Sequence, residues 1–168
     1  MTTNYDGSHR AEQPRIAVIG AGRHSAACHG PALTALSDRF QPVAVCDLDE
    51  DKARSYAEKY GFPTVYADYE VMLAKEDVDG LVVITPIEHT QAVVEDLLPR
   101  GISLLMEKPP GANSEETRSM LRTARRCGTP HMISFNRRFN PALVRARRWV
   151  RQNASDRPIR MALGRLLR

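Results

Sequence analysis

The chain has few cysteines, and their number and spacing exclude some classes of protein. Cys28, Cys46 and Cys127 are the only three in 168 residues, and they lie far apart. An odd number at this spacing suits neither a disulfide framework nor a zinc site. A catalytic thiol needs an activating partner, which the sequence does not indicate. We therefore expect three reduced packing residues, and we predict no metal site.

Long apolar runs are also missing. No stretch approaches the roughly 20 apolar residues that cross a bilayer, so we expect no membrane span. Residues 1–13 are polar and lack the apolar core of a secretory signal peptide, which favours a disordered N-terminal tail and a cytoplasmic protein. The hydrophobic share of 42% and the charged share of 26% are ordinary for a globular protein, and 168 residues suit one full domain.

Acidic residues are scarce in the C-terminal part of the chain. Residues 118–168 contain 14 Arg and one acidic residue, Asp156, whereas residues 1–117 contain 10 Lys and Arg against 19 Asp and Glu. The net charge of +4 therefore conceals a strongly basic C-terminal block. Such a block is either a surface for nucleic acid or an acidic partner, or a solvated helix face with its neighbours elsewhere in a larger assembly.

Short β-branched runs alternate with longer segments of helical period, which is the pattern of βαβ units. Strands are predicted at 15–19, 42–46, 64–66, 80–84, 103–106 and 131–135, and helices at 25–37, 49–60, 69–75, 88–100, 114–127 and 140–152. The strand runs are apolar without alternation, as strands buried on both faces should be. Asp49 and Ser114 stand where helix N-caps belong, and Gly61, Gly101 and Gly128 follow the last helical turns. We predict an α/β fold with a doubly wound parallel sheet, the Rossmann fold.

A glycine turn follows the first predicted strand and precedes a helix, the context that a dinucleotide fingerprint requires. In Gly20-Ala-Gly22-Arg-His-Ser25, Gly20 permits the tight turn and Gly22 lets the backbone approach a pyrophosphate. The helix N-terminus supplies N–H donors, so we also place Arg23 and His24 at the cofactor. Ser25 replaces the third glycine, and a residue this small is expected to be tolerated there. An ordinary turn between strand and helix is the alternative.

Asp47 ends the second strand, about the distance past the glycines at which an acidic residue meets the adenosine ribose. A carboxylate accepts hydrogen bonds from both ribose hydroxyls and repels a 2′-phosphate, so the sequence favours NAD over NADP. The alternative role is a cap for the next helix, for which Asp49 is equally well placed.

Two further segments follow the carboxyl ends of predicted strands, at the edge where such sheets bind ligands. Thr85-Pro86 follows the fourth strand, and Glu107-Lys108-Pro109-Pro110 follows the fifth. Lys108 can hydrogen-bond a substrate hydroxyl or stabilise a developing alkoxide. The alternatives are a strand-ending proline and a solvated surface lysine.

Together these segments resemble the N-terminal half of the glucose–fructose oxidoreductase / inositol dehydrogenase / rhizopine catabolism (Gfo/Idh/MocA) family, over about residues 14–168. The resemblance rests on Gly20-x-Gly22, His29-x-Pro31-Ala32-Leu33, Asp47, Thr85-Pro86, Glu107-Lys108-Pro109 and Phe135-Asn-Arg-Arg-Phe-Asn-Pro141. It implies NAD(P)-dependent oxidation or reduction of a sugar, polyol or related hydroxyl compound. It also implies Lys108 as the catalytic residue near the nicotinamide and the substrate oxygen, with Asn136 and Arg137 beside the substrate, and cofactor contacts from Thr85, Pro86, Glu107 and Lys108.

The sequence departs from the family pattern in two places. Members commonly have a histidine five residues beyond the threonine matching Thr85, whereas here Thr90 stands there and the histidine is His89. His89 is thus either a cofactor contact or a helix-start residue without a ligand. Members also continue into an antiparallel-sheet domain that supplies the substrate pocket, an oligomer interface and an acid/base histidine. We expect a Rossmann domain at 14–153, then residues 154–168, with a strand at 159–167, as the start of that truncated domain.

Three functions are consistent with these residues. The first is a nicotinamide-dependent dehydrogenase or its cofactor-binding portion, which would bind cofactor better than it turns over substrate and, with the second domain present, would form a homo-oligomer. The second is a non-catalytic NAD-binding sensor or partner-binding module. The third is nucleic-acid binding through the arginines around Trp149, namely Arg145, Arg147, Arg148 and Arg151.

Overall fold

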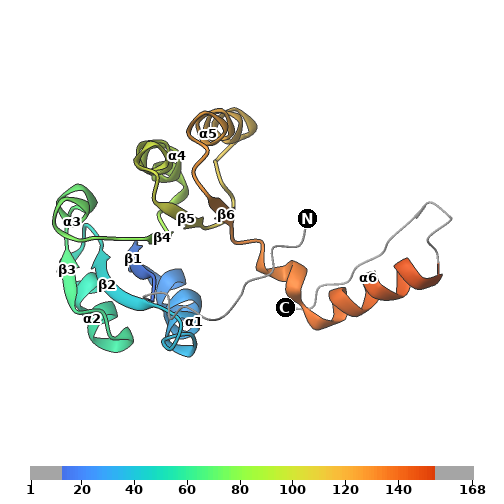
Figure 1. Cartoon of the computed structure of the whole chain (residues 1–168), viewed down its shortest axis with the longest axis horizontal. Coiled ribbons are helices and arrows are strands. Elements are labelled where there is room, and N and C mark those ends of the chain that lie inside the picture. The colour runs from blue at the N-terminus through green and yellow to red at the C-terminus, as the bar shows by residue number, and fades with distance from the viewer. Residues whose placement is uncertain (1–12, 154–168) are drawn as a thin grey trace. The chain divides into compact units, whose positions relative to one another are not determined.

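The computed structural model describes residues 13–153 (Figure 1). The chain divides between Ser134 and Phe135 into two units. Residues 1–12 of the predicted N-terminal tail and the strand predicted at 159–167 lie outside the described residues. The first unit contains a six-stranded sheet with its helices. The second unit contains the 3-10 helix η3 (Asn136–Phe139) and α6 (Pro141–Asn153).

All strand pairs of the sheet are parallel, in the order β3-β2-β1-β4-β5-β6. The strands are β1 (Arg15–Ile19), β2 (Gln41–Cys46), β3 (Thr64–Tyr66), β4 (Gly80–Val83), β5 (Ser103–Met106) and β6 (His131–Ile133). The order along the sheet reverses between β1 and β4, which makes this pair the topological switch point. The predicted doubly wound Rossmann fold is confirmed.

Helices cover both faces of the sheet. They are η1 (Ser25–His29), α1 (Gly30–Ala35), α2 (Glu50–Tyr60), α3 (Tyr69–Lys75), α4 (Ile87–Leu97), η2 (Leu98–Arg100) and α5 (Ser114–Cys127). Figure 1 shows α1 and α2 on one face and α3, α4 and α5 on the other. Because successive side chains of a strand point to opposite faces, the core has two layers.

The central strand β1 contributes to both layers. Ala17 and Ile19 pack in the larger layer with residues of α3, α4 and α5, whereas Val18 packs with Ala53 and Tyr56 of α2. Every residue of β4 is buried as well. The apolar runs of the inner strands β1, β2 and β4 are therefore largely buried on both faces, as predicted. The prediction is wrong for the outer strand β6, where His131 and Met132 are exposed.

Most predicted helix ends agree with the structure. Asp49 caps α2 by accepting a hydrogen bond from the N–H of Lys52 at 3.3 Å. Gly61, Gly101 and Gly128 follow α2, η2 and α5 with positive φ. The expectation for Ser114 is wrong, because this residue already lies in α5.

Asn113 caps α5 in place of Ser114. Its backbone is extended, with φ −147° and ψ 177°, and its side-chain oxygen accepts the N–H groups of Glu115 and Glu116. The side chain of Glu116 in turn accepts from the N–H of Ala112 at 2.8 Å. Asparagine suits this position as well as serine does.

Two predicted helices differ in detail from the observed ones. The segment predicted at 88–100 divides into α4 and η2, because Pro99 has no N–H to continue the α-helical pattern. The segment predicted at 25–37 instead has helical backbone from Arg23 to Ala35 and includes the π-helical turn η1. Among residues 13–153, no helix combines the length and the apolar character that a membrane crossing requires.

Candidate functional site

The residues predicted to meet a ligand follow the carboxyl ends of neighbouring strands. Gly20 follows β1, Asp47 follows β2, Thr85 is the second residue after β4, and Glu107 follows β5. Since all the strands are parallel, these positions lie along one edge of the sheet. The edge includes the switch point between β1 and β4, where open α/β sheets bind their ligands.

The turn after β1 depends on the two glycines for different reasons. Gly20 has a φ of +101°, and a Cβ atom there would lie 2.1 Å from the carbonyl oxygen of Ile84. Only glycine fits this conformation and this close approach. Gly22 has no heavy atom within 4 Å of a Cβ position, so it faces open space. The first glycine shapes the turn, and the second leaves room beside it.

Asp47 holds the glycine turn in place. Its Oδ2 accepts a hydrogen bond from the N–H of Ala21 at 2.7 Å, and its Oδ1 accepts from the N–H of Asp49 at 3.0 Å. A carboxylate has about four acceptor sites, so each oxygen keeps a further lone pair after these bonds. Asp47 is half-buried and can therefore accept two more donors at the sheet edge.

The helical segment after the turn is fixed against α2. A Cβ atom at Gly30 would lie 2.4 Å from ring atoms of Tyr60, and the Tyr60 hydroxyl donates to the carbonyl oxygen of Ala26. Ser25 is fully buried at the position where the fingerprint has its third glycine. The small serine side chain is thus accommodated in the packed interior, as the sequence predicts.

The Thr85-Pro86 segment is tied to the start of α4. The hydroxyls of Thr85 and Thr90 lie 3.1 Å apart, and the Thr90 hydroxyl also donates to the carbonyl oxygen of Pro86 at 3.1 Å. Thr90 is buried, whereas His89 is exposed in the first turn of α4. Thr90 therefore stabilises the loop, and His89 is free to meet solvent or a ligand.

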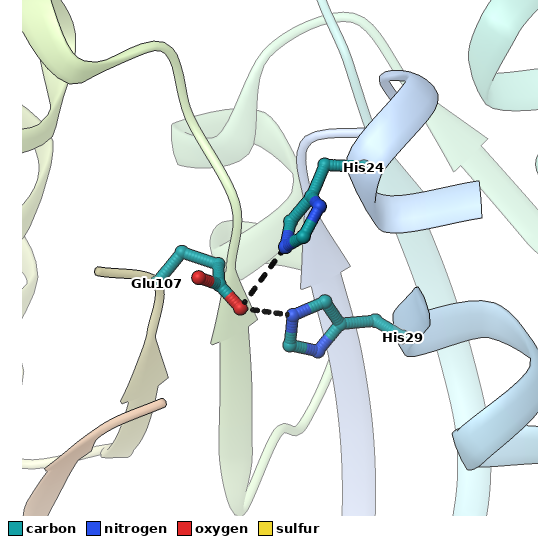
Figure 2. A group of neighbouring side chains, drawn as sticks. All are labelled: His24, His29 and Glu107. Carbon is teal, nitrogen blue, oxygen red and sulfur yellow. Dashed lines mark hydrogen bonds and ion pairs between the residues drawn. The ribbon is translucent and has the colours of Figure 1, made fainter. Parts of the chain in front are cut away.

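Two histidines from the first helical segment meet the carboxylate at the end of β5. Figure 2 shows the rings of His24 and His29 turned toward the same oxygen, Oε1 of Glu107. The Nε2 atom of His29 lies 2.7 Å from it, and the Nε2 atom of His24 lies 3.3 Å from it. The side chains of His29 and Glu107 are each 12% exposed, and that of His24 is 51% exposed. This histidine–glutamate cluster joins the turn after β1 to the end of β5.

The second oxygen of Glu107 is also engaged. Its Oε2 accepts a hydrogen bond from the backbone N–H of Lys108 at 2.9 Å. Burial raises the pKa of Glu107, but the hydrogen bonds from His29 and Lys108 outweigh burial and hold this pKa below its ordinary value. Glu107 is thus an ionised acceptor at neutral pH. The Lys108 side chain is exposed, and the Lys108–Pro109 peptide bond is cis.

The predicted substrate residues belong to the second unit. Asn136 and Arg137 lie in η3 and are exposed. The structure therefore brings together His24 and Glu107, and it ties Asp47 to the glycine turn.

His29 is the part of the cluster that the site prediction omitted. The sequence indicates it only as a mark of the family. In an α-helix of 3.6 residues per turn, residues five positions apart diverge by about 140°. The N–H of Gly30 instead donates to the carbonyl oxygen of Ser25, the i to i+5 bond of a π-helix. This wider turn lets His24 and His29 face the same carboxylate.

The chain is similar in sequence to a known family and to several of its members. Residues 14–135 match the model of the family described as "Oxidoreductase family, NAD-binding Rossmann fold". Among curated proteins, the chain is 35% identical over 129 residues to the D-glucoside 3-dehydrogenase of Escherichia coli (strain K12), an alignment of 74% of this chain and 35% of that protein. It is 31% identical over 116 residues to the D-xylose 1-dehydrogenase (NADP(+)) 2 of Haloferax volcanii, covering 69% of this chain and 35% of that protein.

A solved structure shows the same likeness. The WlbA dehydrogenase of Chromobacterium violaceum, determined in complex with NADH and UDP-GlcNAcA, matches with a TM-score of 0.78 and 25% sequence identity. The match covers 86% of this chain and 41% of that one. The chain thus spans about a third of the length of the curated relatives and about two fifths of the solved chain.

Proposed function

The chain belongs to the oxidoreductase family with an NAD-binding Rossmann fold, and from this premise we propose that it binds a nicotinamide dinucleotide across the switch point and takes part in hydride transfer to or from a sugar or polyol. The substrate class follows from the relatives, which are named as dehydrogenases of glucosides and xylose. In this proposal, residues at the carboxyl ends of β1, β2, β4 and β5 contact the cofactor and the substrate.

The observation that best supports the proposal is the conformation of the glycine turn after β1. Gly20 fixes a turn that no other residue fits, Asp47 holds it, and Gly22 keeps open space beside the start of a helical segment. The first N–H groups of a helix have no intrahelical partners and carry partial positive charge. These features suit the pyrophosphate of a dinucleotide.

Asp47 favours NAD over NADP in this proposal. Its two carboxylate oxygens each keep a lone pair for a ribose hydroxyl after bonding Ala21 and Asp49. A 2′-phosphate would bring a second negative charge to the same oxygens, which costs free energy. The family alone does not choose between the two cofactors, so this selectivity rests on Asp47.

Lys108 is proposed to act on the substrate oxygen. A bound nicotinamide would supply the hydride acceptor for oxidation of a substrate carbon that bears a hydroxyl group. The exposed ammonium group of Lys108 donates a hydrogen bond to the substrate oxygen and stabilises negative charge that develops there. Asn136 and Arg137 are proposed to hold other substrate hydroxyls, and Thr85, Pro86 and His89 to border the cofactor.

Titration of the protein with NADH, followed by the fluorescence of the dihydronicotinamide, tests the proposal. Saturable binding is expected, and it should weaken in Asp47→Ala but not in the matched variant Asp49→Ala, which removes a neighbouring exposed carboxylate. An absence of binding at millimolar NADH would contradict the proposal. Tight binding without turnover of any sugar or polyol would instead favour a non-catalytic NAD-binding sensor.

A further inference from the structure

The histidine–glutamate cluster has the donor set and the spacing of a metal site. The candidate ligand atoms are the Nε2 atoms of His24 and His29 and a carboxylate oxygen of Glu107, and all lie within 4.8 Å of one another. Both nitrogens are directed at one oxygen rather than at separate partners (Figure 2). A cation placed among the three atoms would accept all of them as ligands.

Two imidazole nitrogens and a carboxylate oxygen are typical ligands of zinc. Zn²⁺ binds histidine nitrogen and glutamate oxygen at about 2.0–2.2 Å, so small rotations of the three side chains suffice to surround it. The ion would replace a proton between His29 and Glu107, which already lie in hydrogen-bond contact. Since 51% of the His24 side chain is exposed, the cluster is open to ions from solvent.

The other ring nitrogen of His24 also has a partner. Its Nδ1 lies 3.8 Å from the Sγ atom of Cys28, one helical turn along the chain. A metal-bound histidine commonly donates its second ring N–H to a neighbouring acceptor, which fixes the tautomer. In the tautomer that donates from Nδ1 to this sulfur, Nε2 of His24 has a lone pair available to a metal ion.

The backbone positions these ligands before any ion binds. The π-helical turn η1 brings the two histidines to one side, and Glu107 follows β5 directly, with its Oε2 held by the N–H of Lys108. His29 and Glu107 are largely buried, which limits the freedom they lose on binding a metal. We propose that His24, His29 and Glu107 form a three-ligand Zn²⁺ site with one coordination position open to solvent. The proposal does not depend on the proposed dehydrogenase activity.

Zinc binding to the whole 168-residue chain, freed of metal by a chelator and then dialysed, tests this inference without any cofactor. Isothermal titration with zinc sulfate is expected to give one ion per chain. His24→Asn and His29→Asn should each weaken binding by on the order of 100-fold or abolish it, since each removes a ligand. Cys28→Ala removes only the neighbour of His24 and should weaken binding by about tenfold.

The matched control is His131→Asn. This histidine is also surface-exposed, but it lies in β6 with its Nδ1 atom 2.8 Å from the carbonyl oxygen of Thr129. The control should bind zinc as the unchanged protein does. Circular dichroism shows whether each variant is folded, and His24→Asn alters the most exposed ligand and so is the variant least able to disturb the fold. Either no stoichiometric binding by the unchanged protein, or unchanged affinity in a folded His24→Asn variant, overturns the site.

Discussion

The α-carbon of Gly20 packs against the carbonyl group of Ile84, so that even a methyl group at Gly20 would lie 2.1 Å from that oxygen. This contact joins the turn after β1 to the end of β4, the two strands of the switch point. The dinucleotide turn is therefore part of the packed sheet edge. Its shape follows from a backbone contact as much as from its own sequence.

We expect Gly20→Ala to destabilise the protein by about 3 kcal/mol or more, because it combines backbone strain with overpacking. Gly22→Ala is the matched variant: its Cβ meets no atom within 4 Å, so stability should change by less than about 1 kcal/mol. Gly22→Ala should nevertheless weaken NADH binding, because the methyl group would occupy the space in which we propose that the pyrophosphate binds. Urea unfolding and NADH titration measure the two effects, and equal stabilities of the two variants would contradict the assignment.

Asp47→Asn is expected to change cofactor choice. The amide keeps one oxygen for the N–H of Ala21 but loses the charge, so NADH affinity should fall by about tenfold, as for loss of a hydrogen bond to a charged group. NADPH affinity should fall less or rise, because the repulsion of the 2′-phosphate is removed. Parallel titrations with NADH and NADPH give the ratio. Asp49→Asn serves as control, and the same ratio in both variants would refute the role of Asp47.

His29 and Glu107 are expected to stabilise the fold through each other. In the presence of a chelator, His29→Asn and Glu107→Gln should each lower the free energy of unfolding by about 1–3 kcal/mol. Each substitution leaves the other, largely buried side chain without its hydrogen-bond partner. The double variant should lose less than the sum, with a coupling above about 0.5 kcal/mol. If urea unfolding shows that the losses of free energy are additive, the 2.7 Å contact between His29 and Glu107 does not contribute to stability.

Cys46 gives the protein a defined alkaline pH dependence. Burial, with help from the negative charges of Asp68 and Asp47, raises the pKa of its thiol from 9.0 to about 12. Between these pH values the unfolded chain releases the thiol proton while the folded chain keeps it, so stability falls as pH rises, by up to about 1.4 kcal/mol per pH unit. Urea unfolding between pH 8 and pH 11 should show this loss. In Cys46→Ala the loss should be smaller, and equal slopes would disprove the link.

Lys108→Ala is expected to separate binding from catalysis. Because the ammonium group acts on the substrate oxygen in our proposal, turnover should fall by on the order of 100-fold or more while NADH affinity changes little. The measurement needs the form of the protein that turns over a sugar or polyol. Lys52→Ala, which removes an exposed lysine paired with Asp49, is the control. Unchanged turnover in Lys108→Ala would remove Lys108 from the mechanism.

Much of the fold follows from local sequence patterns. Apolar runs such as those of β1 and β4 specify buried parallel strands, and Gly61 or Gly128 mark helix ends because few other residues adopt positive φ easily. Asn113 shows the limit of this approach. Asparagine and serine are both good N-caps, so only the extended backbone at Asn113 decides between the two neighbouring residues.

The site was predictable in part. The positions of Gly20, Asp47 and Glu107 at one sheet edge follow from the order of parallel strands. The contact between His29 and Glu107 does not, because it depends on the π-helical turn η1, which no periodic pattern in the sequence indicates. The hydrogen bond from Ala21 to Asp47 is not predicted either, since the sequence indicates only a ribose contact or a helix cap for this side chain.

The order of the strands also governs how the domain forms during synthesis. β1 pairs on one side with β2 and on the other with β4, where Ile16 lies opposite Gly80, 64 positions later. At ribosomal rates of about 5–20 residues per second, the second edge of β1 stays unpaired for several seconds. The free N–H and C=O groups of an unpaired apolar strand can form hydrogen bonds with strands of other chains, which leads to aggregation. Nascent chains that stop before β4 are therefore expected to aggregate more than chains long enough for β4 to pair with β1.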